Sequence, residues 1–261
     1  YLNNRLNLTA DAYVRDTKGM QTSGKKLPGA YGANEPKQNA ANLRTKGWEL
    51  MLTWNDAFKL ANKPFRYNLS VGLADNTSEI TKFDNPSKIL SDYYVGQKLG
   101  DIWGYVVDGL FRTDEEAANY NVDQTAVNFV INTAQVNPGL HAGDMKFVDL
   151  DGDHTISSGS NTADDPGDRK IIGNSLPRYT YSIQGGFDWY GFDFSIYLQG
   201  VGHQDWYPGT NSVFFWGPYA RPYSSFIPRD FLSQVWSPEN PDAYFPRPIG
   251  YLALGNNRSL G

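Results

Sequence analysis

An acidic run in the second half of the chain is its clearest candidate for chemistry. Aspartates alternate at Asp149, Asp151 and Asp153, and Thr155 offers a backbone carbonyl two positions further on. These are the first ligand positions of a Ca²⁺-binding loop of the EF-hand type, and oxygen ligands suit a hard cation. Asp168 follows after an insertion and could add a carboxylate. We therefore predict a metal site made of these five residues, holding a structural Ca²⁺.

Two positions of this run depart from the Ca²⁺-loop pattern. His154 stands where the sharp turn normally takes glycine, and Ser160 stands where a bidentate carboxylate is expected. An Asp-rich surface turn without a metal is therefore the alternative interpretation. If a cation is bound, we expect its role to be structural, because converging carboxylates without a cation repel one another.

The sequence lacks the other common patterns of catalytic chemistry. It has no nucleophile-elbow motif, no phosphate-binding glycine loop and no zinc-type histidine pair, since His141, His154 and His203 stand apart. Two carboxylates could flank a glycosidic bond, but with 28 acidic residues such a pair is expected by chance. No Lys/Arg cluster interleaves with aromatic residues, which argues against nucleic-acid binding. We predict no enzyme activity, no catalytic residue and no organic cofactor.

The elements that must position the acidic loop are segments in which apolar and polar residues alternate strictly. In the first segment Leu6 and Leu8 alternate with Asn7 and Thr9, the period of two that places successive side chains on opposite faces of a strand. The predicted strands cover about residues 2–15, 46–54, 66–75, 178–189 and 192–201. Water-soluble β-sandwiches show the same alternation, so this feature alone leaves both classes open.

The lengths of the connections separate the two classes. A compact Pro-containing link at 55–65 and a tight turn at Tyr190-Gly191 alternate with long loops at 16–45, 76–177 and 202–261. Outer-membrane barrels have short periplasmic turns and long extracellular loops, so every second connection is long. Connections in compact soluble domains are about 4–6 residues. We therefore predict an all-β fold, a transmembrane antiparallel β-barrel with long extracellular loops.

Composition agrees with this prediction. No apolar run approaches the roughly 20 residues that a spanning helix needs, but each barrel strand shows lipid only alternate residues. Aromatic residues make up 15% of the chain, and Trp48, Trp54, Trp189 and Tyr190 fall at strand ends, where the aromatic girdles of a barrel lie. The chain opens within a strand and ends within a loop. Because five strands cannot close a barrel, we expect an internal fragment of a longer chain.

Several motifs also carry a family resemblance. The runs GDMKFVDLDGD (143–153) and DRKIIGNSLPRYTY (168–181), followed by GFDFSIYLQG (191–200), resemble the signature of SusC/RagA-type TonB-dependent outer-membrane transporters. Further matching motifs are KGWEL (46–50), GDIWGY (100–105), DGLF (108–111) and WSPENP (236–241). They follow the family's order from end to end of the chain. His154 and the insertion 157–167 depart from the family pattern, which puts the metal in question more than the fold.

The resemblance implies both an architecture and a function. This stretch resembles part of the C-terminal half of a 22-stranded barrel, without the plug domain. The family imports a nutrient actively, a glycan or a peptide, across the bacterial outer membrane. TonB supplies energy through the plug, and a SusD-like surface lipoprotein closes the barrel as a lid. The resemblance therefore implies outer-membrane lipid around the barrel and loops at the cell surface.

Aromatic loop residues are the candidates for ligand contact, because sugars stack on aromatic faces. The predicted ligand-binding residues are Tyr93, Tyr94, Trp103, Tyr105, Trp206 and Trp216. Such residues also pack loops, so that interpretation stays open for each. The alternative function is a secreted, Ca²⁺-stabilised carbohydrate-binding β-sandwich module. That module would turn its apolar faces inward, whereas the transporter would turn them toward lipid.

Overall fold

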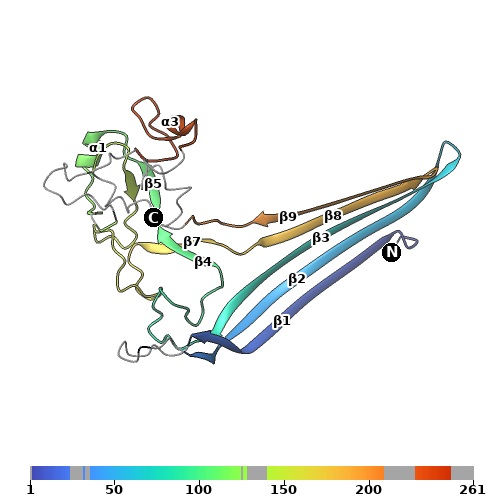
Figure 1. Ribbon diagram of the computed structural model, residues 1–261, viewed down its shortest axis with the longest axis horizontal. Coiled ribbons are helices and arrows are strands. Elements are labelled where there is room, and N and C mark those ends of the chain that lie inside the picture. Colours follow the sequence, from blue (N-terminus) through green and yellow to red (C-terminus); the bar gives the residue numbers. More distant parts are fainter. Residues whose placement is uncertain are drawn as a thin grey trace. The chain divides into compact units, whose positions relative to one another are not determined.

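The computed structural model describes residues 2–23, 32, 36–124, 126–127, 140–208 and 227–247. The chain divides into two compact units, the first made of 1–101 and 173–205 and the second of 102–172 and 206–261. Strands dominate the described residues, and the two helices among them are short (Figure 1). Neither helix is long and apolar enough to cross a membrane.

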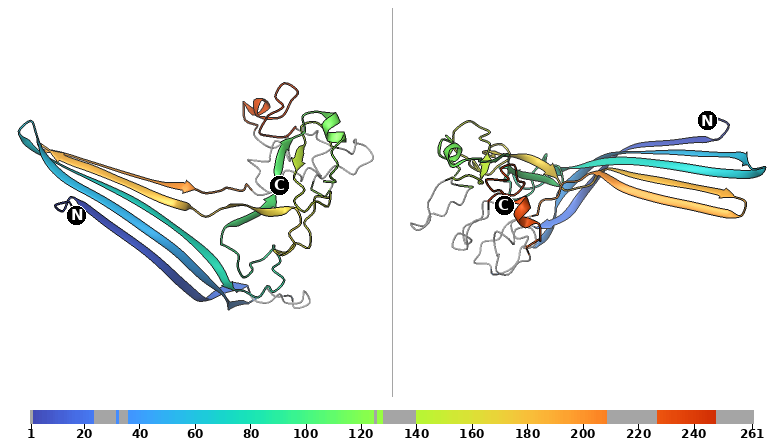
Figure 2. Two further views of the ribbon diagram at one scale, coloured as in Figure 1. Left: turned by 180° about the vertical axis from the view of Figure 1, so that it is seen from behind. Right: turned by 90° about the horizontal axis from the view of Figure 1, so that it is seen from above.

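Unit 1 is built on one antiparallel sheet of five strands in the order β1-β2-β3-β8-β9 (Figure 1). The strands are β1 (Leu6–Ser23), β2 (Lys37–Leu60), β3 (Lys63–Lys82), β8 (Arg178–Trp189) and β9 (Phe192–His203). The β2–β3 and β8–β9 turns lie at the same end of the sheet (Figure 2). The predicted all-β antiparallel fold is thus present, and neighbours in sequence are neighbours in the sheet wherever the connection is short.

The strands are longer than their apolar alternation. The first three strands contain 18, 24 and 20 residues and run past the predicted 2–15, 46–54 and 66–75, so much of the predicted loop 16–45 is strand. Polar cross-strand pairs continue the ladder there: the Thr45 and Ser78 hydroxyls lie 2.8 Å apart, and the Arg44 guanidinium donates to both oxygens of Asp16. These pairs stabilise the part of the sheet in which apolar and polar residues no longer alternate.

The two tight turns rest on left-handed backbone. Ala61 and Asn62 have φ of 48° and 60°, and Tyr190 and Gly191 have φ of 51° and 84°. Positive φ at both central residues is the geometry of a two-residue hairpin turn, which matches the twist of the flanking strands. The predicted link 55–65 is therefore wrong in extent, since β2 runs on to Leu60 and Pro64 already lies within β3.

The long connection between β3 and β8 carries structure of its own. Strand β4 (Asp101–Tyr105) pairs with β7 (Arg169–Asn174), and β5 (Val107–Leu110) pairs with β6 (Met145–Phe147). Phe111 and Ile156 are fully buried in unit 2. The helix α3 (Phe231–Gln234) belongs to a smaller cluster in which Phe231, Val235 and Phe245 pack together. The described parts of the predicted loop 76–177 are thus folded.

Helix α1 (Asp114–Ala118) shows how local sequence forms these short elements. The Thr113 hydroxyl accepts a hydrogen bond from the Glu116 amide at 3.1 Å, and the Glu116 carboxylate accepts one from the Arg112 amide at 2.8 Å. This reciprocal arrangement at the helix start satisfies backbone donors that have no partner within the helix. It explains why so short a helix forms here.

Candidate membrane-facing surface and cation site

One face of the unit 1 sheet is apolar across all five strands. The register places Leu8, Leu52, Val71, Ile183 and Leu198 in one row. The next row toward the turns contains Trp54, Leu69 and Ile196. These side chains are accessible: Leu69 is 44% exposed and Leu198 is 52% exposed. A face this apolar and this open is suited to an apolar environment outside the chain.

The exposure of this face bears on the β-sandwich alternative. In a sandwich the two inner faces interdigitate and bury their side chains. Among the described residues, the buried apolar side chains are Ile80, Tyr94, Phe111, Ala117, Phe147, Ile156, Phe231 and Val235, and none of them lies in the two rows above. The apolar face therefore lacks the packing that a water-soluble sandwich requires.

Aromatic rings form a continuous row on this face near the tight turns. The ring centroids of Phe58 and Phe65 lie 5.0 Å apart, those of Phe65 and Phe187 5.3 Å, and those of Phe187 and Phe194 5.4 Å. Trp48 lies toward the other end of the apolar face, ten residues from Phe58 along β2. Ten residues rise about 34 Å, which a tilt of about 40° reduces to about 26 Å along the barrel axis. This matches the apolar band of an outer-membrane barrel, about 25 Å tall.

The opposite face of the same sheet is polar. One row runs across the sheet as Asn7, Thr53, Ser70, Gln184 and Tyr197. The Thr53 and Ser70 hydroxyls lie 3.1 Å apart, within hydrogen-bonding distance. Hollows of about 540 and 760 Å³ lie over this face. The two faces of each strand therefore differ in chemistry as predicted from the alternation.

Ion pairs fasten the sheet where the apolar face ends. The Arg178 guanidinium donates to both oxygens of Asp75, each at 2.6 Å, and the Asp75 side chain is only 8% exposed. Planar bidentate pairs of this kind are among the stronger polar contacts. The pair joins the start of β8 to β3 across about a hundred residues of sequence. Sequence reasoning missed it, because no local pattern links the two positions.

The acidic loop of unit 2 brings three of the predicted ligands close together. Asp149, Asp151 and Asp153 each offer a carboxylate oxygen, and these oxygens lie within 4.8 Å of one another. The Asp149 carboxylate accepts hydrogen bonds from the amides of Gly152 and His154 at 2.6 and 2.9 Å. His154 has φ of 64°, so it adopts the left-handed conformation expected of glycine at this position. The departure from the Ca²⁺-loop pattern at His154 is therefore one of residue type and not of backbone conformation.

The other two predicted ligands lie differently. Asp168 is fully buried, and its two oxygens accept hydrogen bonds from the Leu150 and Ser157 amides, each at 2.7 Å. It is not one of the three clustered carboxylates, and it holds the two ends of the loop together. Thr155 bridges to Asp123, and this bridge uses the His154 carbonyl and the Ile156 amide. The Thr155 carbonyl takes no part in that pairing.

The electrostatics of the loop favour a cation. The Asp153 amide lowers the pKa of Asp151, but burial and the charges of Asp168, Asp153 and Asp149 outweigh it, so the pKa of Asp151 is raised. Partial burial acts to raise the pKa of Asp149, yet the amides of His154 and Gly152 hold it below its usual range. The charged form of Asp149 is thus stabilised by its surroundings, whereas that of Asp151 is destabilised by repulsion from the neighbouring carboxylates. A divalent cation would relieve that repulsion.

The predicted ligand-binding aromatics occupy different environments. Tyr94 is 6% exposed and lies in the interior of its loop, which the Asn85 side chain closes by bonding to the backbone of Ile89 and Tyr93. Tyr93 is exposed and its ring meets that of Phe83 edge-on at 5.8 Å. Of Tyr93 and Tyr94, Tyr93 is the one whose ring is open to a ligand.

The remaining aromatics of that prediction lie further along the chain. The Tyr105 ring packs edge-on against Phe147 at 6.0 Å, and burial raises the pKa of its hydroxyl. The indole nitrogen of Trp103 is buried with no hydrogen-bond partner among the described residues. Trp206 is 71% exposed, while Trp216 lies outside the described residues. The role of these aromatics as ligand contacts stays a prediction.

Comparisons with known proteins show which proteins this chain is similar to. No protein-family model matches the chain. The chain is 27% identical over 215 residues to TonB-dependent receptor P39 of Formosa agariphila, covering 74% of this chain and 20% of that protein. It is 23% identical over 209 residues to TonB-dependent receptor P3 of the same organism, covering 75% and 18%. The chain thus spans about a fifth of the length of these relatives.

A solved structure gives the same indication for the fold. The RagAB peptide transporter superposes with a TM-score of 0.55 at 17% identity, over 94% of this chain and 24% of that one. The predicted fold class, an antiparallel outer-membrane β-barrel, is therefore confirmed, while the predicted count of 22 strands stays a prediction. Together with the sequence relatives, this confirms the resemblance of the chain to a segment of SusC/RagA-like TonB-dependent transporters.

Proposed function

We propose that this chain forms part of the wall and surface loops of a transporter that imports a nutrient across the bacterial outer membrane. The observation that carries the proposal is the exposed apolar face of the unit 1 sheet, flanked by aromatic residues at a spacing that fits the lipid band. The polar face of the same strands would line the interior of the barrel. The work of such a segment is binding and passage, with no covalent step.

The rest of the machinery lies outside this chain. We propose that a plug domain elsewhere in the full-length protein contacts TonB, and that a SusD-like lipoprotein closes the barrel from the outside. The cargo is a glycan or a peptide. The relatives named as TonB-dependent receptors support the first partner, and the likeness of fold to the RagAB transporter supports a barrel of this kind. Tyr93, Trp103, Tyr105 and Trp206 remain proposed ligand contacts.

We also propose a structural Ca²⁺ in the acidic loop. The carboxylates of Asp149, Asp151 and Asp153 would hold it, with the Thr155 carbonyl as a further oxygen ligand. Asp168 would act by fixing the loop ends. The three clustered carboxylates and the left-handed backbone at His154 fit an oxygen-coordinated hard cation. The ion would stiffen unit 2 and take no part in a reaction.

Uptake by whole cells tests the proposed function. The gene for the full-length protein would be deleted, and uptake of labelled oligosaccharides and of labelled peptides would be compared with the parent strain. We expect the uptake of one of the two ligand classes to be lost in the deletion strain and in a strain without TonB. Restoring the full-length gene to the deletion strain should restore that uptake. Unchanged uptake of both classes in the deletion strain would contradict the proposal.

A further inference from the structure

A cavity of about 510 Å³ lies within unit 2, and none of its lining residues belongs to the acidic loop. Strands β5 and β6, Arg112, and Glu116 of α1 form part of its lining, and the segment 241–244 forms the rest. Its size falls within the range of small-molecule sites, about 300–1,000 Å³. Apolar groups line it together with a few converging charged groups, which is the usual make-up of a binding site.

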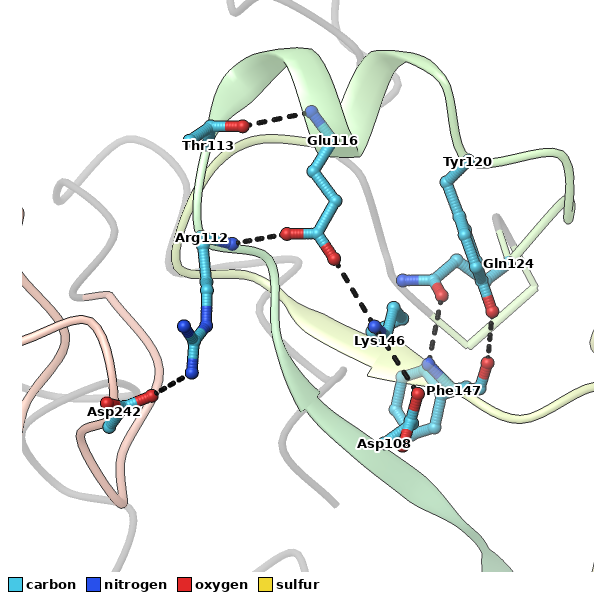
Figure 3. Close-up of polar contacts among 9 residues, drawn as sticks. All are labelled: Asp108, Arg112, Thr113, Glu116, Tyr120, Gln124, Lys146, Phe147 and Asp242. Atoms are coloured by element: carbon cyan, nitrogen blue, oxygen red, sulfur yellow. Dashed lines mark hydrogen bonds and ion pairs between the residues drawn. The ribbon is translucent and has the colours of Figure 1, made fainter.

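The charged groups at this cavity are joined by ion pairs (Figure 3), and the side chains of Arg112, Asp108 and Asp242 are 66%, 68% and 74% exposed and so accessible to a ligand. The Lys146 ammonium lies 3.3 Å from a carboxylate oxygen of Asp108 and 3.3 Å from one of Glu116. The Arg112 guanidinium pairs with Asp242, and the Arg112 amide donates to Glu116. Partial burial lowers the pKa of Lys146, but its bonds to Glu116 and Asp108 outweigh this, so the pKa is raised and the ammonium stays charged.

An aromatic ring stands at the edge of the same cavity. Tyr244 is 82% exposed although it lines the cavity. Its ring meets Phe245 edge-on, with centroids 4.9 Å apart, and Phe245 packs in turn on Phe231. The ring is therefore held at one edge while most of its surface is open. An open aromatic ring beside polar groups is suited to the apolar face of a sugar ring.

The pairing of the charges decides which ligand fits. Each of the three carboxylates and two cations at the cavity already has a partner of opposite charge, so no uncompensated charge favours a charged ligand there. A neutral ligand with several hydroxyl groups needs no such charge. It could use the second oxygens of Asp108 and Asp242 and the free N–H groups of Arg112, because a carboxylate has about four acceptor positions and a guanidinium has five donors.

We infer that this cavity is a binding site for a neutral sugar unit of an oligosaccharide, with Tyr244 as the stacking surface and Arg112, Asp108 and Asp242 as the hydrogen-bonding groups. The inference rests on the proposed function and narrows its cargo from a glycan or a peptide to a glycan. Lys146 and Glu116 position Asp108 and Arg112. The site is separate from the aromatics proposed from the sequence.

Binding to the full-length protein in detergent tests the inference. The probes are neutral hexasaccharides of glucose, xylose, mannose and galactose, with a blocked tripeptide as the peptide probe. Affinities would be measured by calorimetry for the wild type and for Tyr244→Ala, Asp242→Asn and Leu232→Ala. Leu232 is a matched control, because it is 79% exposed in the same part of the chain and does not line the cavity.

We expect at least one hexasaccharide to bind the wild type and the Leu232→Ala variant equally. Its affinity should fall about tenfold in Tyr244→Ala, which is about 1.4 kcal/mol, and to a smaller extent in Asp242→Asn. Binding of no hexasaccharide to the wild type, equal binding to Tyr244→Ala, or a Tyr244-dependent binding of the tripeptide alone would each overturn the inference. TonB-dependent uptake, measured in parallel, reports separately on the proposed function.

Discussion

The two units of this chain handle apolar side chains in opposite ways. In unit 2, the side chains of Phe111 and Ile156 are completely buried. In unit 1, the strands leave rows of leucine, valine and isoleucine open on one face. The comparison shows that one sequence can contain both a buried core typical of water-soluble domains and an exposed apolar surface suited to lipid. The register of the strands decides which residues lie on the apolar face.

The largest effect should come from opening the core of unit 2. Phe111→Ala removes a fully buried ring, which should cost about 3–5 kcal/mol of local stability. Hydrogen exchange of the full-length protein, followed by mass spectrometry, should show faster exchange in 102–124 and 140–172 and unchanged exchange in β2 and β3. Equal acceleration in both units would contradict the separation of the two regions.

A charge on the apolar face of unit 1 should have the next largest effect. Val71→Arg places a cation in the middle of the apolar face, where lipid exposure costs about 2–4 kcal/mol. Ser70→Arg puts the same charge on the opposite face and serves as the matched control, with a much smaller expected effect. Urea unfolding of the full-length protein from lipid vesicles gives both values. A larger loss for the control would reverse the assignment of the two faces.

A charge contact in unit 2 should have a moderate, pH-dependent effect. The Arg112 amide, followed by the Lys146 ammonium, holds the pKa of Glu116 below its usual range. The stability that Glu116 contributes is therefore present above the ordinary glutamate pKa, about 4.3, and is lost as the pH falls below it. Glu116→Gln should speed amide exchange of 112–120 by less at pH 3.5 than at pH 7, after correction for intrinsic rates. If Glu116→Gln sped amide exchange equally at both pH values, the charge of Glu116 would not contribute to the stability of this segment.

The smallest expected effect is that of Asp151→Asn on amide exchange in the acidic loop, and its sign should depend on whether Ca²⁺ is present. Without Ca²⁺, the Asp153 amide lowers the pKa of Asp151, but partial burial and the neighbouring carboxylates outweigh it and raise the pKa, so the charge of Asp151 destabilises the loop at neutral pH and less so as the pH falls. Asp151→Asn should therefore slow amide exchange of the loop slightly when a chelator is present. In millimolar Ca²⁺ the wild type should become the more protected form. Identical exchange of the wild type with chelator and with Ca²⁺ would count against the cation site.

The existence of the five long strands could be predicted, but their extent could not. Leu6 to Val14 and their counterparts signal strands because one side of each is apolar. Beyond that band both faces are polar, so the ladder continues through contacts such as Arg44 with Asp16 that leave no periodic apolar signal. A strand in water on both faces looks like a loop in the sequence.

The acidic site was likewise predictable only in its local part. Asp149, Asp151 and Asp153 converge because alternate positions of a tight loop point inward. The contacts of Asp168 could not be predicted, since they depend on how the insertion folds back to the Leu150 and Ser157 amides. The cavity near Tyr244 joins segments about a hundred residues apart, and no spacing in the sequence signals it.

The central claim is that the apolar face of unit 1 meets lipid and the opposite face does not. It is tested most directly with single cysteines at Leu50, Leu69 and Ile196 and at Ser70, Gln184 and Ser195 in the full-length protein in outer-membrane vesicles. Each would be labelled with a fluorophore and exposed to a quencher confined to lipid. We predict quenching of the first three sites and none of the last three. Equal protection of both sets from the lipid quencher would contradict the claim.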